Sequence, residues 1–100
     1  MPNIVFFNSY KLKKGASIPD FLSAVEKLNN EYISKQAGYL SFKLMADGDT
    51  WADSTTFATM EDAQSFAGAC EPNEFAEAFY SFLDPNSCES HFFSVEKSYE

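Results

Sequence analysis

The sequence has no arginine, one histidine (His91), one tryptophan (Trp51) and two cysteines in 100 residues. Its seven lysines are outnumbered by fifteen acidic residues, so the net charge is −8 at pH 7. Nucleic-acid binding requires a basic face that neutralises phosphates, and arginine is the residue best suited to bidentate contacts with phosphates and bases. The composition therefore argues against nucleic acid as a partner.

The scarcity of metal-binding and targeting signals sets further limits. Cys70 and Cys88 lack metal-site spacing, and a single histidine makes a structural zinc site implausible. No glycine-rich phosphate loop is present, so we expect neither a metal nor a nucleotide cofactor. No apolar run approaches the roughly 20 residues of a membrane span, and the N-terminus does not resemble a signal peptide. We expect a cytoplasmic protein that does not bind membranes and whose two thiols stay free.

Aromatic and apolar residues are abundant. The apolar share is 45%, with eleven phenylalanines and five tyrosines. This is ample material for one core, so we predict a single domain spanning residues 1–100. Because a small domain cannot enclose all of its apolar surface, this composition indicates either a subunit interface or an enclosed ligand pocket.

The hydrophobic pattern predicts alternating strands and helices. β-Branched and aromatic residues, or alternation of apolar and polar residues, predict strands over 4–12, 39–46, 50–58 and 90–97. Asp-Gly at 47–48 favours a tight hairpin turn between the second and third strands.

Two helices are expected between these strands. Ser17, with Asp20 three residues later, begins an amphipathic helix that we expect to end at Gly38. Thr59, with Asp62, begins a second helix, which Pro72 interrupts and Asn73 restarts.

The order strand, helix, strand, strand, helix, strand is typical of an α+β, ferredoxin-like βαββαβ fold. Such a fold has a four-stranded antiparallel sheet with both helices on one face. The opposite face also carries apolar residues, among them Val5 and Phe7. A second copy of the chain is the simplest cover for such a face, so we expect a homodimer.

Three stretches carry a resemblance to a known family. These are YKLKKG before the first helix, QAGYLSFKL at 36–44 and FATMEDAQSFA at 57–67. In these the chain resembles dimeric α+β-barrel proteins of the antibiotic-biosynthesis-monooxygenase kind, along nearly its whole length. The resemblance implies two sheets that form a barrel across the dimer, with a pocket in each subunit between sheet and helices.

The resemblance also suggests activities. Several members of that family oxidise aromatic substrates such as polyketide intermediates without metal or flavin. Others degrade haem, using an asparagine in the first strand, a tryptophan at the end of the third and a histidine in the following helix. Asn8 matches the first position, but Phe57 replaces the tryptophan and residues 75–79 offer no histidine. Two of the three residues are missing, which argues against haem degradation.

Matching Asn8 and Phe57 to that pattern predicts which strand face lines the pocket. Because side chains alternate along a strand, this face carries two sets of residues. They are Phe6, Asn8 and Tyr10 of the first strand, and Trp51, Asp53, Thr55 and Phe57 of the third. As catalytic candidates we take Asn8, Asp53 and His91. Asn8 could orient a developing oxyanion, Asp53 could act as a general base if burial raised its pKa, and His91 carries an imidazole, a group suited to proton transfer. As substrate-binding candidates we take Phe6, Tyr10, Trp51, Thr55, Phe57, Phe66 and Phe79.

Three functions remain open on the sequence alone. The first is a cofactor-free monooxygenase or related enzyme that acts on a small aromatic or polyketide-like substrate. The second is a non-catalytic module that binds a small apolar ligand in the same pocket. The third is a structural dimer whose aromatic side chains fill the interior, leaving no pocket.

Overall fold

The computed structural model describes residues 3–69 and 73–99. Its elements are β1 (Ile4–Lys11), α1 (Ile18–Glu31), η1 (Ile33–Lys35), β2 (Tyr39–Asp47), β3 (Thr50–Phe57), α2 (Met60–Ala67), α3 (Glu74–Tyr80), η2 (Pro85–Ser87) and β4 (Glu89–Ser94). The strands form an antiparallel sheet in the order β2-β3-β1-β4. The predicted ferredoxin-like arrangement, with β1 and β3 as central neighbours, is confirmed.

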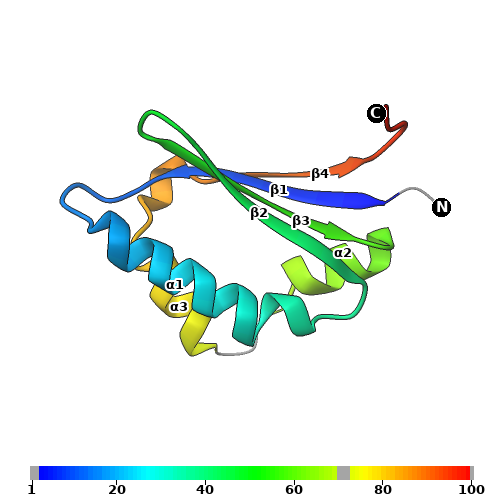
Figure 1. The fold of residues 1–100 in the computed structure, drawn as a ribbon, viewed down its shortest axis with the longest axis horizontal. Helices are drawn as coiled ribbons and strands as arrows, with labels where there is room; N and C mark the ends of the chain where they lie inside the picture. The colour runs from blue at the N-terminus through cyan, green and yellow to red at the C-terminus, as the bar shows by residue number, and fades with distance from the viewer. Residues whose placement is uncertain (1–2, 70–72, 100) are drawn as a thin grey trace.

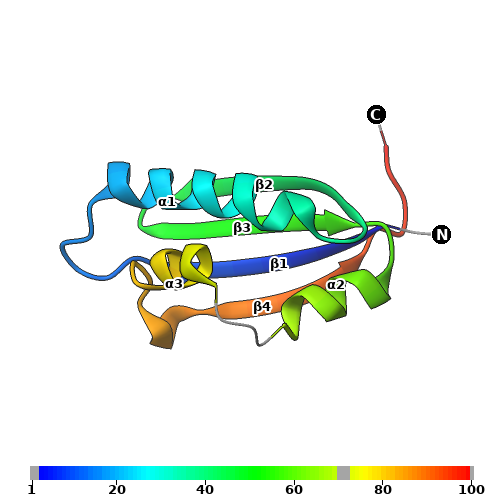
Figure 2. The ribbon, with the colours of Figure 1, turned by 90° about the horizontal axis from the view of Figure 1, so that it is seen from below.

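The helices all lie on one face of this sheet (Figure 1). Seen from the helix side, α1 runs along β2 and β3, whereas α3 and α2 follow each other along β1 and β4 (Figure 2). Within residues 3–69 and 73–99, no helix covers the other face of the sheet. No helix in the described ranges is long and apolar enough to cross a membrane.

Helix α1 begins as the sequence predicts and ends earlier than predicted. The Ser17 hydroxyl accepts a hydrogen bond from the Asp20 backbone N–H at 3.3 Å, and the stripe of Phe21, Val25 and Leu28 is buried. The helix ends at Glu31, and the short turn η1 follows. Gly38, expected as the helix end, instead adopts a φ of 78° immediately before β2. A side chain there would collide with the Asp62 carboxylate, so this close approach also requires glycine.

Strand β2 contains an irregularity that the alternation pattern did not reveal. The pairing register with β3 shifts between Tyr39 and Ser41. As a result Leu40, expected on the same face as Phe42 and Leu44, is 50% exposed. Phe42 and Leu44 themselves pack against the core beneath the helices.

The two shorter helices begin at the predicted caps. The Thr59 hydroxyl accepts from the Asp62 N–H, and the Asn73 side-chain oxygen accepts from the N–H groups of Phe75 and Ala76. The expected roles of Cys70 and Pro72 fall outside the described residues.

The buried side chains under the helices form two clusters. One comprises Tyr10, Phe21, Val25, Leu28, Ile33, Phe79 and Leu83. The other comprises Ile4, Phe57 and Ala63, at the opposite end of β1 and β3. Phe66 packs against both clusters.

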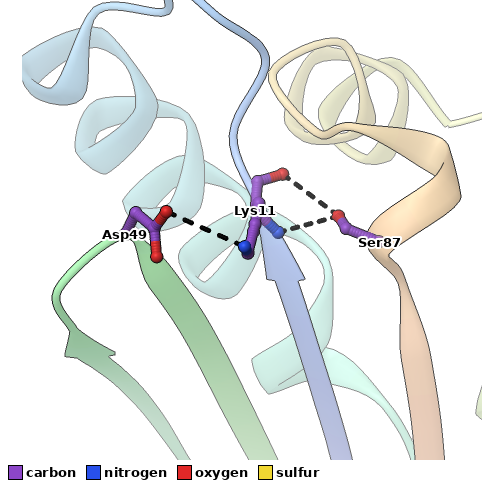
Figure 3. Close-up of polar contacts among 3 residues, drawn as sticks. All are labelled: Lys11, Asp49 and Ser87. Carbon is purple, nitrogen blue, oxygen red and sulfur yellow. Dashed lines mark hydrogen bonds and ion pairs between the residues drawn. The ribbon is translucent and has the colours of Figure 1, made fainter.

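The end of β1 is held between two other segments (Figure 3). The Lys11 backbone N–H donates to the Ser87 hydroxyl at 2.8 Å, and the Lys11 ammonium lies 3.8 Å from the Asp49 carboxylate. Leu12 also pairs with Leu83 in an isolated bridge. The β2–β3 hairpin and the η2 turn thus lie on either side of the same strand.

Candidate functional site

A row of three polar side chains crosses the sheet on its helix-covered side. In the strand register, Asn8 of β1 lies opposite Asp53 of β3 on one side and opposite Ser90 of β4 on the other. Residues directly opposite each other in antiparallel strands project from the same face of the sheet. The register by itself therefore gathers Ser90, Asn8 and Asp53.

Hydrogen bonds connect this row. One Asp53 oxygen accepts from the Asn8 amide nitrogen at 3.0 Å, and the other accepts from the Tyr10 hydroxyl at 2.7 Å. The Asn8 amide oxygen accepts from the Ser90 hydroxyl at 2.5 Å. We call Ser90, Asn8, Asp53 and Tyr10 the polar network.

Burial dominates the electrostatics of this network. Asp53 is only 5% exposed, and loss of hydration raises its pKa, while the hydrogen bonds from Asn8 and Tyr10 partly oppose this effect. The pKa of Tyr10 is also raised, first by burial and then by the neighbouring Asp53 charge. The Tyr10 phenol therefore stays protonated and remains a hydrogen-bond donor to the carboxylate.

The network borders a cavity between the sheet and the helices. This cavity has a volume of about 150 Å³. Asn8, Asp53 and Thr55 contribute its polar sheet-side wall. Its aromatic lining is Phe6, Tyr32, Phe42, Phe66, Phe79 and Tyr80. A carboxylate of raised pKa on the wall of an aromatic cavity is the arrangement expected of a general acid or base.

A second cavity lies beside the first, near β4. It has a volume of about 210 Å³ and shares Asn8 and Asp53 with the first cavity. The other polar residues that line it are Tyr10, Tyr80, Cys88, Glu89 and Ser90. Asp53 and Asn8 thus stand where the two cavities meet, within reach of ligands in either.

Most predicted site residues are brought together. Phe6, Asn8, Asp53, Thr55, Phe66 and Phe79 line the first cavity, and Tyr10 lines the second. Phe57 belongs instead to the core, because it is fully buried with Ile4 and Ala63.

Trp51 and His91 are corrections to the sequence analysis. Trp51 lines neither cavity at Asp53; its ring packs edge-on against Phe21, with 5.2 Å between ring centroids. His91 lies opposite Phe7 in the register, on the uncovered face, where it is exposed and stacks on Phe93. Strand alternation sends Ser90 to the helix side and its neighbour His91 to the other side, so His91 cannot act on a ligand at Asp53.

Sequence reasoning missed several residues of the site. Ser90 could have been found, because pairing the first and last strands antiparallel places a residue near 90 beside Asn8. Tyr32, Phe42 and Tyr80 come from elements whose approach to the cavity depends on how the helices pack.

Comparisons with known proteins agree on the fold. No protein-family model matches this chain, and no curated protein sequence matches it significantly. Among solved structures, the chain has the ferredoxin-like fold of antibiotic biosynthesis monooxygenase-like proteins.

Three solved structures illustrate the likeness. SnoaB from Streptomyces nogalater, a cofactor-independent oxygenase, superposes with a TM-score of 0.78 at 13% identity, over 98% of this chain and 97% of its own. A candidate antibiotic biosynthesis monooxygenase from Bacillus cereus gives a TM-score of 0.67 at 13% identity, over 100% and 99% of the two chains. A dimeric protein of unknown function from Bacteroides fragilis gives 0.65 at 14% identity, over 93% and 96%. At these identities the likeness establishes the fold.

Proposed function

We propose that this protein is a cofactor-independent monooxygenase that acts on a small aromatic or polyketide-like substrate with an acidic C–H bond. The substrate would occupy the cavity between the sheet and the helices. One observation carries the proposal: Asp53 is a buried carboxylate at the wall of an aromatic cavity, held by two hydrogen-bond donors. The fold shared with a cofactor-independent oxygenase supports it.

In this reaction Asp53 accepts the proton from the substrate C–H. The carbanion transfers one electron to dioxygen, and the resulting substrate radical and superoxide combine to form a peroxide. The proton returns to the peroxide, and loss of water leaves a carbonyl. One oxygen atom thus enters the product and the other leaves as water, so a methylene group becomes a ketone.

Two further members of the network, Asn8 and Tyr10, have supporting roles in this proposal. Asn8 uses one amide N–H to hold Asp53, and its second N–H can donate to the oxygen on which the carbanion charge is delocalised. Tyr10 stabilises the ionised form of Asp53. Burial, which raises the Asp53 pKa, brings it closer to the working pH and makes the carboxylate a stronger base.

The test uses anthrone as the probe, because its central methylene is acidic and its oxidation to anthraquinone is easily followed. Wild-type protein should consume one dioxygen per anthraquinone formed. Asp53→Asn should reduce this rate by about 100-fold or more, since a positioned base contributes at least that factor. Asp49→Asn, an aspartate in the exposed β2–β3 turn, is the matched control and should leave the rate unchanged.

An Asp53→Asn variant that keeps the wild-type rate would contradict the proposed base. If anthrone binds, as followed by chemical-shift changes at Phe6 and Phe66, without any turnover, the protein is better described as a binding module of the same fold.

The proposal includes a homodimer that forms through the uncovered face of the sheet, in the cytoplasm. Val5, Phe7, Met45 and Phe93 lie on this face, and Phe93 is 52% exposed. A protein of this fold from Bacteroides fragilis is dimeric. Light scattering should give twice the monomer mass for the wild type and the monomer mass for Phe93→Glu. A monomeric wild type would refute this part of the proposal.

A further inference from the structure

Ser90 has no part in the chemistry proposed above, yet it lies in the same row as Asn8 and Asp53. It belongs to β4, which is an edge strand whose six residues are all exposed. A serine hydroxyl in such a strand can be satisfied by water. The Ser90 hydroxyl instead points from β4 toward β1 and donates to the Asn8 amide oxygen at 2.5 Å.

The Ser90 contact holds the Asn8 amide in the orientation that the Asp53 carboxylate requires. An asparagine amide has an acceptor oxygen on one side and a donor nitrogen on the other. With the oxygen engaged by Ser90, the nitrogen faces Asp53 and donates to it at 3.0 Å. A flipped amide would instead place its oxygen against the carboxylate. An ionised carboxylate only accepts hydrogen bonds, so the flipped amide would repel it.

We propose that Ser90 is a positioning residue: its hydroxyl holds the Asn8 amide in place, with the amide nitrogen toward Asp53, and thereby keeps Asp53 in its proton-accepting form. Its importance for catalysis rests on the proposed function, in which Asp53 is the base. Its effect on Asp53 does not require any substrate and can be measured separately.

Other titratable groups surround the same carboxylate. They are Tyr10 from β1, Tyr32 between α1 and η1, Tyr80 from α3, and Cys88 and Glu89 at the start of β4. The facing residues of α2, Phe66 and Ala67, and the β2 partner of Asp53, Leu44, carry no charge. None of these groups changes in the variants below, so a difference between variants reports on Ser90 itself.

The experiment follows the Asp53 carboxyl carbon by NMR while the pH is changed. Ser90→Ala should move the Asp53 titration to higher pH, by about one unit, because a hydrogen bond to a charged group is lost or weakened. Ser90→Thr retains the hydroxyl and should restore the wild-type titration. Ser94→Ala, on the same strand and the same face, is the matched control and should leave the titration unchanged.

A double-mutant cycle then tests whether Ser90 acts through Asn8. Asn8→Ala should also raise the titration midpoint, and adding Ser90→Ala to Asn8→Ala should produce no further shift. An unshifted Ser90→Ala, or a Ser90→Ala shift that persists without the Asn8 amide, would overturn the proposal.

Anthrone oxidation separates this inference from the proposed function. If the protein oxidises anthrone, the acid limb of its kcat/KM profile should move with the NMR titration in Ser90→Ala and return in Ser90→Thr. If the titration moves but the acid limb does not, the catalytic part of the proposal for Ser90 is wrong. If the wild type does not oxidise anthrone at all, the proposed function fails on that probe, and the NMR cycle still decides whether Ser90 orients Asn8.

Discussion

Two regions of the same helix-covered face are built from the same pair of strands, yet one is filled and the other is hollow. In the filled region Tyr10 lies opposite Trp51, and Phe21 packs against both rings. One row further along, Asn8 lies opposite Asp53, and the cavity begins there.

The difference is one of side-chain size between neighbouring rows. Two large rings hold the helices away from the sheet in the first row, and the small polar pair that follows cannot fill the same depth. The next row pairs Phe6 with Thr55, which also line the cavity, and the row after it, which pairs Ile4 with Phe57, is again buried. The cavity therefore lies where the small polar side chains of Asn8, Asp53 and Thr55 stand between two rows of larger, buried side chains.

The largest expected effect comes from breaking the filled region. Phe21 is fully buried and contacts the rings of Tyr10, Trp51, Phe79 and Phe82. Phe21→Ala should reduce the free energy of unfolding by about 3–5 kcal/mol, because it leaves a new cavity in the packed region. Urea denaturation measures this. Leu22→Ala, which changes the exposed neighbour on α1, should cost less than about 1 kcal/mol.

A smaller effect is expected where the two regions share a residue. Tyr10 contributes its ring to the filled region and its hydroxyl to Asp53. Tyr10→Phe keeps the ring and removes the hydroxyl. It should lower the free energy of unfolding by about 1.5–3 kcal/mol at neutral pH, because the buried Asp53 carboxylate loses a hydrogen-bond donor. Tyr39→Phe removes a part-buried hydroxyl that donates to a neutral amide, that of Asn29, and should cost about 1 kcal/mol. Equal losses for the two variants would show that the Asp53 contact has no special strength.

The stability of the protein should depend on pH because of the buried Asp53 carboxyl in the hollow region. Burial raises the Asp53 pKa in the folded state above its unfolded value of about 3.9. The folded protein therefore takes up this proton more readily, and the associated stability is present below about pH 4 and is lost as the pH rises through the folded pKa.

Asp53→Asn lacks this titration. The stability of the wild type relative to Asp53→Asn should thus fall with rising pH, by about 1.4 kcal/mol for each unit of pKa difference. Urea denaturation of both proteins between pH 3 and pH 8 tests this. A difference that does not vary with pH would contradict a raised Asp53 pKa.

The smallest effect is expected at the exposed end of β1. Lys11 and Asp49 form an ion pair across 3.8 Å, and both side chains are more than half exposed. Asp49→Ala should change the free energy of unfolding by less than about 0.5 kcal/mol, because solvent and salt screen such pairs. A loss above 1 kcal/mol would mean that this contact holds the hairpin against the filled region.

Much of this arrangement follows from local sequence patterns. Alternation along β1 and β3 correctly grouped Asn8, Asp53 and Thr55 on one face, which the family resemblance assigned to the helix side. The caps at Ser17, Thr59 and Asn73 marked the helix starts. These features depend on the chain within a few residues, so they can be predicted without tertiary contacts.

The errors arose where distant segments meet. The early end of α1 and the shifted register at Leu40 depend on how β2 joins the sheet. Trp51 was expected at the ligand and lies in the core, because Phe21 of α1 covers it. No local sequence pattern around Trp51 predicts its contact with Phe21.

The sequence by itself thus determined the order of the elements, which residues of β1 and β3 share a face and the acidic, arginine-free character of the chain. Only the tertiary structure decided that Asp53 is hydrogen-bonded by Asn8 and Tyr10, that Ser90 completes the row, and that a cavity lies beside them. The physical reason is range: alternation and capping act over two to four residues, whereas these contacts join side chains 43 to 82 positions apart through strand register and helix packing.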